Sequence, residues 1–134
     1  MRKEFIKYVN LNIQWQFEKK KLLKIIDKTI SNDDWVNGSE VKKFENNILK
    51  KTNSKYAVAL NSGTDALTLA LHLVGVKKGD EVITPPNSFI SSTSSIIHIG
   101  AKPVFADVCQ DQNINPEQIE KSITKKTKAI MTVH

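Results

Sequence analysis

Apolar residues recur every three or four positions along the first part of the chain, the spacing expected of amphipathic helices. A first helix is predicted over residues 14–30, where this stripe consists of Phe17, Leu22, Leu23, Ile25, Ile26 and Ile30. Turn-forming residues at 31–34 end it. A second helix is predicted to begin at Ser39, a residue type favoured as an N-cap, and to end at the turn 52–54. Residues 1–54 are therefore predicted to be an amino-terminal helical segment.

From residue 55 the pattern changes to short apolar runs that alternate with helical stretches. The predicted strands are 56–60, 81–84, 102–108 and 128–133, and the predicted helices are 65–74, 89–99 and 116–122. This alternation predicts an α/β fold with a mostly parallel sheet and flanking helices. Because the last strand is still running at His134, we expect residues 55–134 to be the first part of a larger domain, with exposed aliphatic side chains where the rest would pack.

The loop after the first predicted strand is a candidate ligand site, since ligands of α/β sheets bind beyond the carboxyl ends of the strands. Gly63 permits a tight turn and a close approach to the backbone, and Thr64 adds a hydroxyl donor. The helix that follows begins with free N–H groups, which favour an anion. The loop therefore predicts a phosphate site, although the same residues also suit an ordinary turn and cap. It matches neither the Walker nor the dinucleotide glycine pattern.

Phe89 follows the second predicted strand, after the rigid pair Pro85 and Pro86. If the two strands are neighbours, its ring lies beside the first loop and can stack on a planar ligand. A position in the hydrophobic core is the alternative.

The charge balance narrows the choice of partners. The net charge of the 134 residues is +6, which is compatible with nucleic-acid binding. The lysines occur throughout the chain with acids close by, however, so we expect no nucleic-acid partner and an attraction for small anions instead. No apolar run is long enough for a membrane span, and the start does not read as a signal peptide, so the expectation is a cytoplasmic protein without a membrane partner. Cys109, the one cysteine, leaves no multi-cysteine metal site and no internal disulfide.

Several segments together resemble the DegT/DnrJ/StrS family of sugar aminotransferases, enzymes of fold type I that depend on pyridoxal phosphate (PLP). The run 61–67 is similar to the family's cofactor loop, and 79–85 and 88–89 to its next segments. Residues 100–108 and 127–134 then continue the match in the same order. The resemblance runs from about Trp35 to the end and implies the amino-terminal portion of the large PLP-binding domain.

The resemblance implies a role for four residues. Gly63, Thr64 and Asp65 would hold the PLP phosphate through backbone amides and the threonine hydroxyl, and Phe89 would stack on the pyridine ring. In the family, the lysine that binds PLP covalently and the carboxylate facing the pyridine nitrogen lie beyond the point that matches His134. No catalytic residue is therefore assigned to this chain, and Asp107 is interpreted as structural.

The function that the resemblance implies is the transfer of an amino group, from glutamate, to a nucleotide-linked keto sugar in polysaccharide or glycan biosynthesis. The full-length parent would be a homodimer, and this chain would be inactive by itself. Two alternatives remain open at this stage. One is a related sugar dehydratase that uses pyridoxamine phosphate, and the other is a non-catalytic phosphate-binding α/β module.

Overall fold

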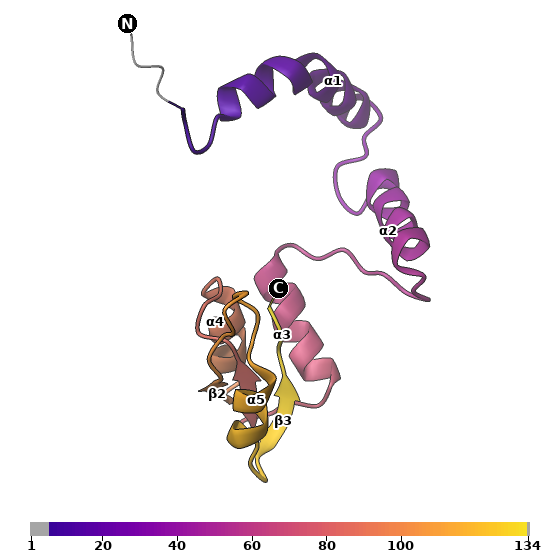
Figure 1. Ribbon diagram of the computed structural model, residues 1–134. Helices are drawn as coiled ribbons and strands as arrows, with labels where there is room; N and C mark the ends of the chain where they lie inside the picture. Colours follow the sequence, from indigo (N-terminus) through magenta and orange to yellow (C-terminus); the bar gives the residue numbers. More distant parts are fainter. Residues whose placement is uncertain (1–5, 134) are drawn as a thin grey trace, which may run out of the picture. The chain divides into compact units, whose positions relative to one another are not determined.

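The computed structural model describes residues 6–133 and divides the chain into two compact units, Met1–Ala59 and Leu60–His134 (Figure 1). The first unit contains helices α1 (Leu11–Ser31) and α2 (Ser39–Thr52). The second contains, in chain order, α3 (Gly63–Leu73), β1 (Glu81–Thr84), α4 (Ser91–His98), β2 (Lys102–Phe105), α5 (Pro116–Ser122) and β3 (Thr127–Ile130). Among the described residues, no helix is both long enough and apolar enough to cross a bilayer.

Helix α2 begins where it was predicted, but Ser39 is not its N-cap. Gly38 holds that position, and the Asp34 carboxylate accepts both the N–H (2.9 Å) and the hydroxyl (2.6 Å) of Ser39. These hydrogen bonds hold the pKa of Asp34 below its ordinary range. A charged acceptor in the preceding turn therefore takes the place of the serine, and a side chain at Gly38 would collide with that carboxylate.

The sheet of the second unit has three parallel strands in the order β2-β1-β3, which confirms the predicted α/β fold with a parallel sheet. The central strand β1 pairs along both edges, with Ile83 opposite Val104 of β2 and Ile130 of β3. All four residues of β1 are buried. The position of this strand therefore fixes the rest of the unit.

Consecutive residues of β1 point to opposite faces of the sheet, and each face has its own core. Val82 packs with Leu71 of α3 and Ile96 of α4. Ile83 packs on the other face with Ala106 and Ile114, next to partly buried residues that include Ile119 of α5. Helices therefore cover both faces, as a parallel sheet requires.

The strand predicted at 56–60 is not formed. None of the described strands pairs with these residues, and the side chains of Tyr56 and Val58 are 87% and 75% exposed. A short apolar run gives only a tendency toward a strand, because a strand forms only when its backbone is hydrogen-bonded to a neighbouring strand.

Two other strands are shorter than predicted, for one reason. β2 ends at Phe105 instead of residue 108, and β3 at Ile130 instead of residue 133. Their shared neighbour β1 ends at Thr84, ahead of Pro85 and Pro86, so the ladder stops soon afterwards. The last ladder bonds run from the N–H of Ala106 to Thr84 and from that of Met131 to Ile83.

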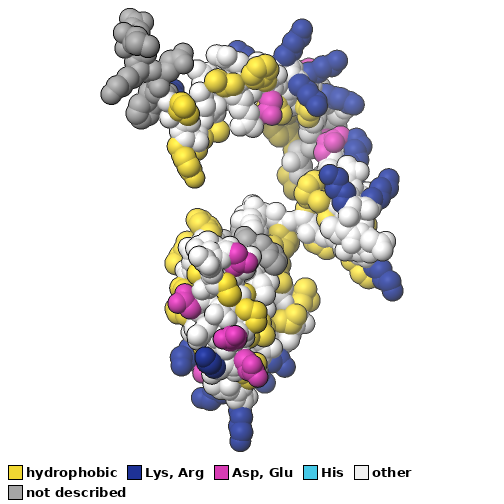
Figure 2. Space-filling view, viewed as in Figure 1, with side chains coloured by type: hydrophobic (Ala, Val, Ile, Leu, Met, Phe, Trp, Pro, Cys, Tyr) yellow, Lys and Arg dark blue, Asp and Glu magenta, His cyan; other side chains and the backbone are white. Residues whose placement is uncertain are grey.

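The surface carries many exposed apolar side chains, as expected from the sequence. Ile130 in β3 is 46% exposed, and Leu73 and Val74 at the end of α3 are 87% and 59% exposed. Figure 2 shows hydrophobic side chains on the visible surface of both units and basic side chains spread along α1 and α2.

Glu81, at the start of β1, is a buried charged residue in the central strand of the sheet. It is 8% exposed, accepts a hydrogen bond from the Thr124 hydroxyl (2.6 Å) and lies 3.6 Å from Lys102 Nζ. The Thr124 hydrogen bond lowers the pKa of Glu81 against the opposing effect of burial, and the charge of Lys102 lowers it further. The ionised form therefore stabilises the fold. This contribution is complete above the pKa of an unfolded glutamate, about 4.3, and is lost as the pH falls through the lower folded value.

We predict that Glu81→Gln lowers the free energy of unfolding at neutral pH and weakens its fall between about pH 5 and pH 3. Urea unfolding at a series of pH values measures both effects. Glu120→Gln, which changes an exposed glutamate of α5, serves as the control and should keep the wild-type pH dependence. An unchanged pH slope in Glu81→Gln would contradict the assigned role of the carboxylate.

Candidate functional site

The first turn of α3 is held by a reciprocal pair of residues. Ser62 is the N-cap, in an extended conformation, and its Oγ accepts the N–H of Asp65 at 3.1 Å. The Ser62 hydroxyl in turn donates to Asp65 Oδ2 at 2.9 Å. This arrangement is a variant of the capping box, in which the N-cap and the third helical residue bind each other. It fixes the loop in front of the helix.

The same turn leaves two backbone donors free. Among the described residues, no group accepts a hydrogen bond from the N–H of Gly63 or Thr64, whereas the N–H of Ala66 already donates to Ser62 O. A Cβ added at Gly63 would meet no atom within 4 Å, so the backbone there is open to a ligand. Free N–H groups and the positive end of the helix dipole together favour an anion.

The start of α4 lies beside the start of α3. Thr64 Oγ1 and Ser91 Oγ, 27 residues apart in the chain, are 2.7 Å from each other. Both helices begin near the carboxyl edge of the sheet, because α4 is the next element after β1 and its first residue contacts the first turn of α3. This is the edge at which α/β proteins bind ligands.

A hollow of about 420 Å³ opens between these two helix ends. It is lined by Gly63, Thr64, Leu67, Phe89, Ser91 and Ser92. Three of the residues selected from the sequence, Gly63, Thr64 and Phe89, therefore lie around one space. The fourth, Asp65, is directed to Ser62 and does not line the hollow.

Phe89 is not a core residue, since it is 77% exposed. Its ring contributes to the wall of the hollow. Asp107, interpreted from the sequence as structural, accepts the N–H of the next residue, Val108, at 2.8 Å. Ser91 was not singled out from the sequence. The only sequence signal for it is the run of serines between residues 91 and 95, which does not indicate which hydroxyl reaches Thr64.

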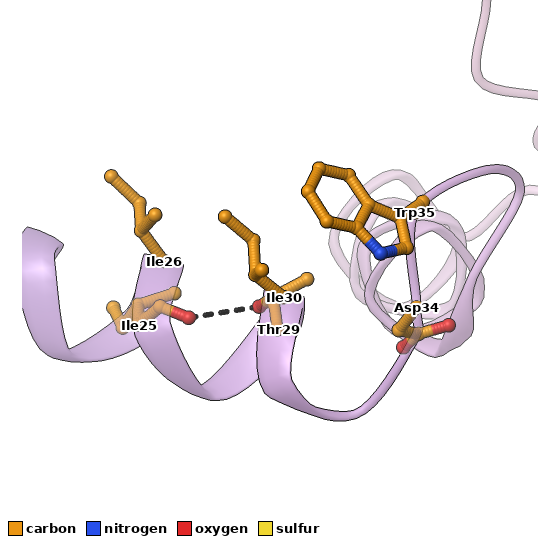
Figure 3. Close-up of a pocket in the computed structure, with 6 residues that line it drawn as sticks. All are labelled: Ile25, Ile26, Thr29, Ile30, Asp34 and Trp35. Atoms are coloured by element: carbon orange, nitrogen blue, oxygen red, sulfur yellow. Dashed lines mark hydrogen bonds between the residues drawn. The ribbon is translucent and has the colours of Figure 1, made fainter.

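A second hollow, of about 330 Å³, lies in the first unit at the end of α1 (Figure 3). It is lined by Ile25, Ile26, Thr29, Ile30, Asp34 and Trp35. Two of its polar side chains are already engaged: the Thr29 hydroxyl donates to Ile25 O at 2.9 Å, and Asp34 accepts hydrogen bonds from Ser39. Within residues 6–133 there is also no cluster of side chains suited to a metal ion. The hollow at the α3 and α4 termini is the candidate site because Gly63 and Thr64, whose N–H groups are free, and Phe89 belong to its lining.

Comparison with known proteins identifies relatives of the whole region. The family model for the DegT/DnrJ/EryC1/StrS aminotransferase family matches residues 16–134. The spore coat polysaccharide biosynthesis protein SpsC of Bacillus subtilis is 47% identical over 98 residues, which are 72% of this chain and 25% of SpsC. GDP-perosamine synthase of Escherichia coli O157:H7 is 41% identical over 103 residues, 75% of this chain and 28% of the synthase. The chain thus spans about a quarter of the length of these two relatives.

Solved structures extend the likeness to the fold. S. venezuelae DesV, in complex with a ketimine intermediate, aligns over 96% of this chain and 35% of its own, with a TM-score of 0.90 and 31% identity. NtdA from Bacillus subtilis, with bound cofactor PMP, aligns over 100% of this chain and 32% of its own, with a TM-score of 0.87 and 29% identity. The helices and parallel sheet described above therefore correspond to the amino-terminal part of fold type I aminotransferases.

We predict that Ser62→Ala destabilises the second unit by about 1 kcal/mol, the usual cost of losing an N-cap. The physical reason is that the N–H of Asp65 loses its acceptor. Urea unfolding of the purified chain gives the free energy difference. Ser31→Ala, an exposed serine in the last turn of α1, is the matched control. Equal stability of the two variants would show that the cap contributes nothing.

Proposed function

This chain belongs to the DegT/DnrJ/EryC1/StrS aminotransferase family, and we propose that it supplies the cofactor-binding part of a PLP-dependent sugar aminotransferase. The observation that carries the proposal is the hollow between the amino termini of α3 and α4. There, free backbone donors of Gly63 and Thr64 face the same space as the exposed ring of Phe89. A phosphate and a planar ring are the two recognisable parts of PLP.

The donor set fits a phosphate. Gly63 and Thr64 offer their N–H groups, and Thr64 offers its hydroxyl as well. Asp65 contributes its N–H, which Ser62 Oγ accepts and which a phosphate oxygen would share. Hydrogen bonds to a charged acceptor are stronger than those between neutral groups, so three or four such donors can hold the dianion without a lysine or arginine.

Phe89 fits the other end of the cofactor. Its exposed ring in the wall of the hollow offers a flat apolar surface on which a pyridine ring can stack. When bound, PLP supplies the electron sink that allows an amino group to be exchanged with a keto group. The residues of this chain bind and orient the cofactor, and none of them is assigned a proton-transfer role.

The substrates and the setting follow from the family. The proposed reaction takes an amino group from glutamate and transfers it to a nucleotide-linked keto sugar, in polysaccharide or glycan biosynthesis. The names of SpsC and GDP-perosamine synthase support this class of substrate. Because the chain spans only about a quarter of these relatives, we propose that the lysine that binds PLP covalently belongs to the part not covered, and that the complete enzyme is a homodimer.

We predict that Thr64→Val weakens the binding of PLP about 10- to 150-fold, since one donor to a charged acceptor contributes about 1.5–3 kcal/mol. Titration of the purified chain with PLP, and with pyridoxal, which lacks the phosphate, measures the effect. Pyridoxal affinity should not change. Thr68→Val is the control, because the Thr68 hydroxyl donates to Thr64 O one turn further along α3. If Thr64→Val bound PLP with wild-type affinity, the Thr64 hydroxyl would not be part of the phosphate site.

Phe89→Ala should weaken PLP and pyridoxal to a similar extent, because stacking on the ring does not involve the phosphate. The absorbance band of the bound cofactor should shift in the same variant. The free energy of unfolding should change by less than about 0.5 kcal/mol, since the side chain is largely exposed. Phe44→Ala, which removes an exposed phenylalanine of α2, is the control. Unaltered pyridoxal binding in Phe89→Ala would exclude the stacking role.

A further inference from the structure

Two hydroxyl residues that line the hollow, Thr64 and Ser91, are hydrogen-bonded to each other, and a bound cofactor would determine which of them is the donor. Thr64 Oγ1 and Ser91 Oγ form a hydrogen bond of 2.7 Å in which either atom can be the donor. Each hydroxyl carries a single proton. Whichever residue donates within the pair therefore has no proton left for a ligand, and the other keeps its own.

The direction of this hydrogen bond determines whether Thr64 offers a proton or a lone pair to a ligand in the hollow. If Thr64 donates to Ser91, the Thr64 oxygen presents only lone pairs to the ligand, which repel an anion. If Ser91 donates to Thr64, the Thr64 proton is free to point at an acceptor in the hollow. Next to the free N–H groups of Gly63 and Thr64, the second direction is the one that an anion stabilises.

The packing of the helices holds the two hydroxyls at this separation. α4 lies against α3, and the residues that follow Ser91 on its buried side include Ser92, 7% exposed, and Ser95, 0% exposed. Small side chains allow a close approach of α4 to its neighbours. The hydrogen bond between Thr64 and Ser91 is therefore built into the interface between two helices and does not depend on a flexible surface side chain.

We propose that Ser91 is a positioning residue for the phosphate site: its hydroxyl donates to Thr64 Oγ1 and so directs the Thr64 proton to a phosphate oxygen of the cofactor. This inference rests on the proposed function, because the direction of the pair matters only if an anion occupies the hollow. Ser91 acts through Thr64 and makes no contact of its own with the phosphate. Its removal should therefore matter only while the Thr64 hydroxyl is present.

The test is a double-mutant cycle on the full 134-residue chain, with PLP and pyridoxal as the two probes. Affinities are taken from the backbone amide shifts of Gly63 and Thr64 during each titration. Ser91→Ala should weaken PLP about 3- to 10-fold, the effect of one neutral hydrogen bond, and leave pyridoxal unaffected. Ser91→Thr, which keeps the hydroxyl, should restore wild-type affinity. In the Thr64→Val background, Ser91→Ala should have no further effect.

The controls separate this inference from the proposed function. Ser94→Ala removes another serine hydroxyl of α4, one that donates to Ser91 O at 3.4 Å, and should bind PLP as the wild type does. If Ser91→Ala perturbs the amide spectrum of the free chain, Ser91→Thr is compared with Ser91→Val instead, because threonine and valine have the same shape and differ in the hydroxyl. PLP bound no better than pyridoxal by the wild type would overturn both the phosphate site and the role of Ser91. If the wild type binds PLP through its phosphate and Ser91→Ala does not change that affinity, only the role of Ser91 is overturned. An additional loss of affinity when Ser91→Ala is combined with Thr64→Val would also overturn it, because it would indicate direct contact between Ser91 and the phosphate.

Discussion

The location of the candidate site depends on the residue at which the central strand β1 ends. Pro85 and Pro86 follow β1 immediately, and proline can neither donate to a sheet ladder nor continue it freely. Both neighbouring strands therefore lose their partner at the same level, and the chain leaves the sheet there to begin α4. The resulting edge collects the amino terminus of α4 and, through the contact between Thr64 and Ser91, that of α3.

A helix that binds an anion must be capped incompletely. If every donor of the first turn were satisfied by the protein, none would remain for a ligand. In α3 the reciprocal pair of Ser62 and Asp65 satisfies the third N–H of the turn and fixes the loop, while the N–H groups of Gly63 and Thr64 stay free. In the proposed phosphate site, the Asp65 N–H is therefore the one donor that the cap and the ligand would share, whereas the N–H groups of Gly63 and Thr64 would serve the ligand alone.

The sequence sufficed for features that depend on local contacts. All five predicted helices agree with the structure to within a few residues, and α5 spans the predicted residues 116–122. Features that depend on distant partners were predicted less well. The run 56–60 has strand character but no strand beside it, and Asp34 displaced the expected cap of α2. The loop of Gly63 and Thr64 could be predicted because ligands of α/β proteins bind beyond the carboxyl ends of strands and because the loop resembles that of the family. The contact of Ser91 with Thr64 could not be predicted, since the two residues are 27 positions apart in the chain.

The residues that line the hollow have the chemistry to bind a cofactor but not to transfer protons for it. Backbone amides, hydroxyls, one leucine and one aromatic ring surround the hollow, and none of its lining residues has a side chain that titrates near neutral pH. Such groups bind a phosphate and support a ring, and their donor strength does not vary with pH over the physiological range. Proton transfer during an amino exchange needs a general base or acid with a pKa near the working pH. In the proposed reaction, that group would come from outside this lining, in keeping with a chain that spans about a quarter to a third of the length of its relatives.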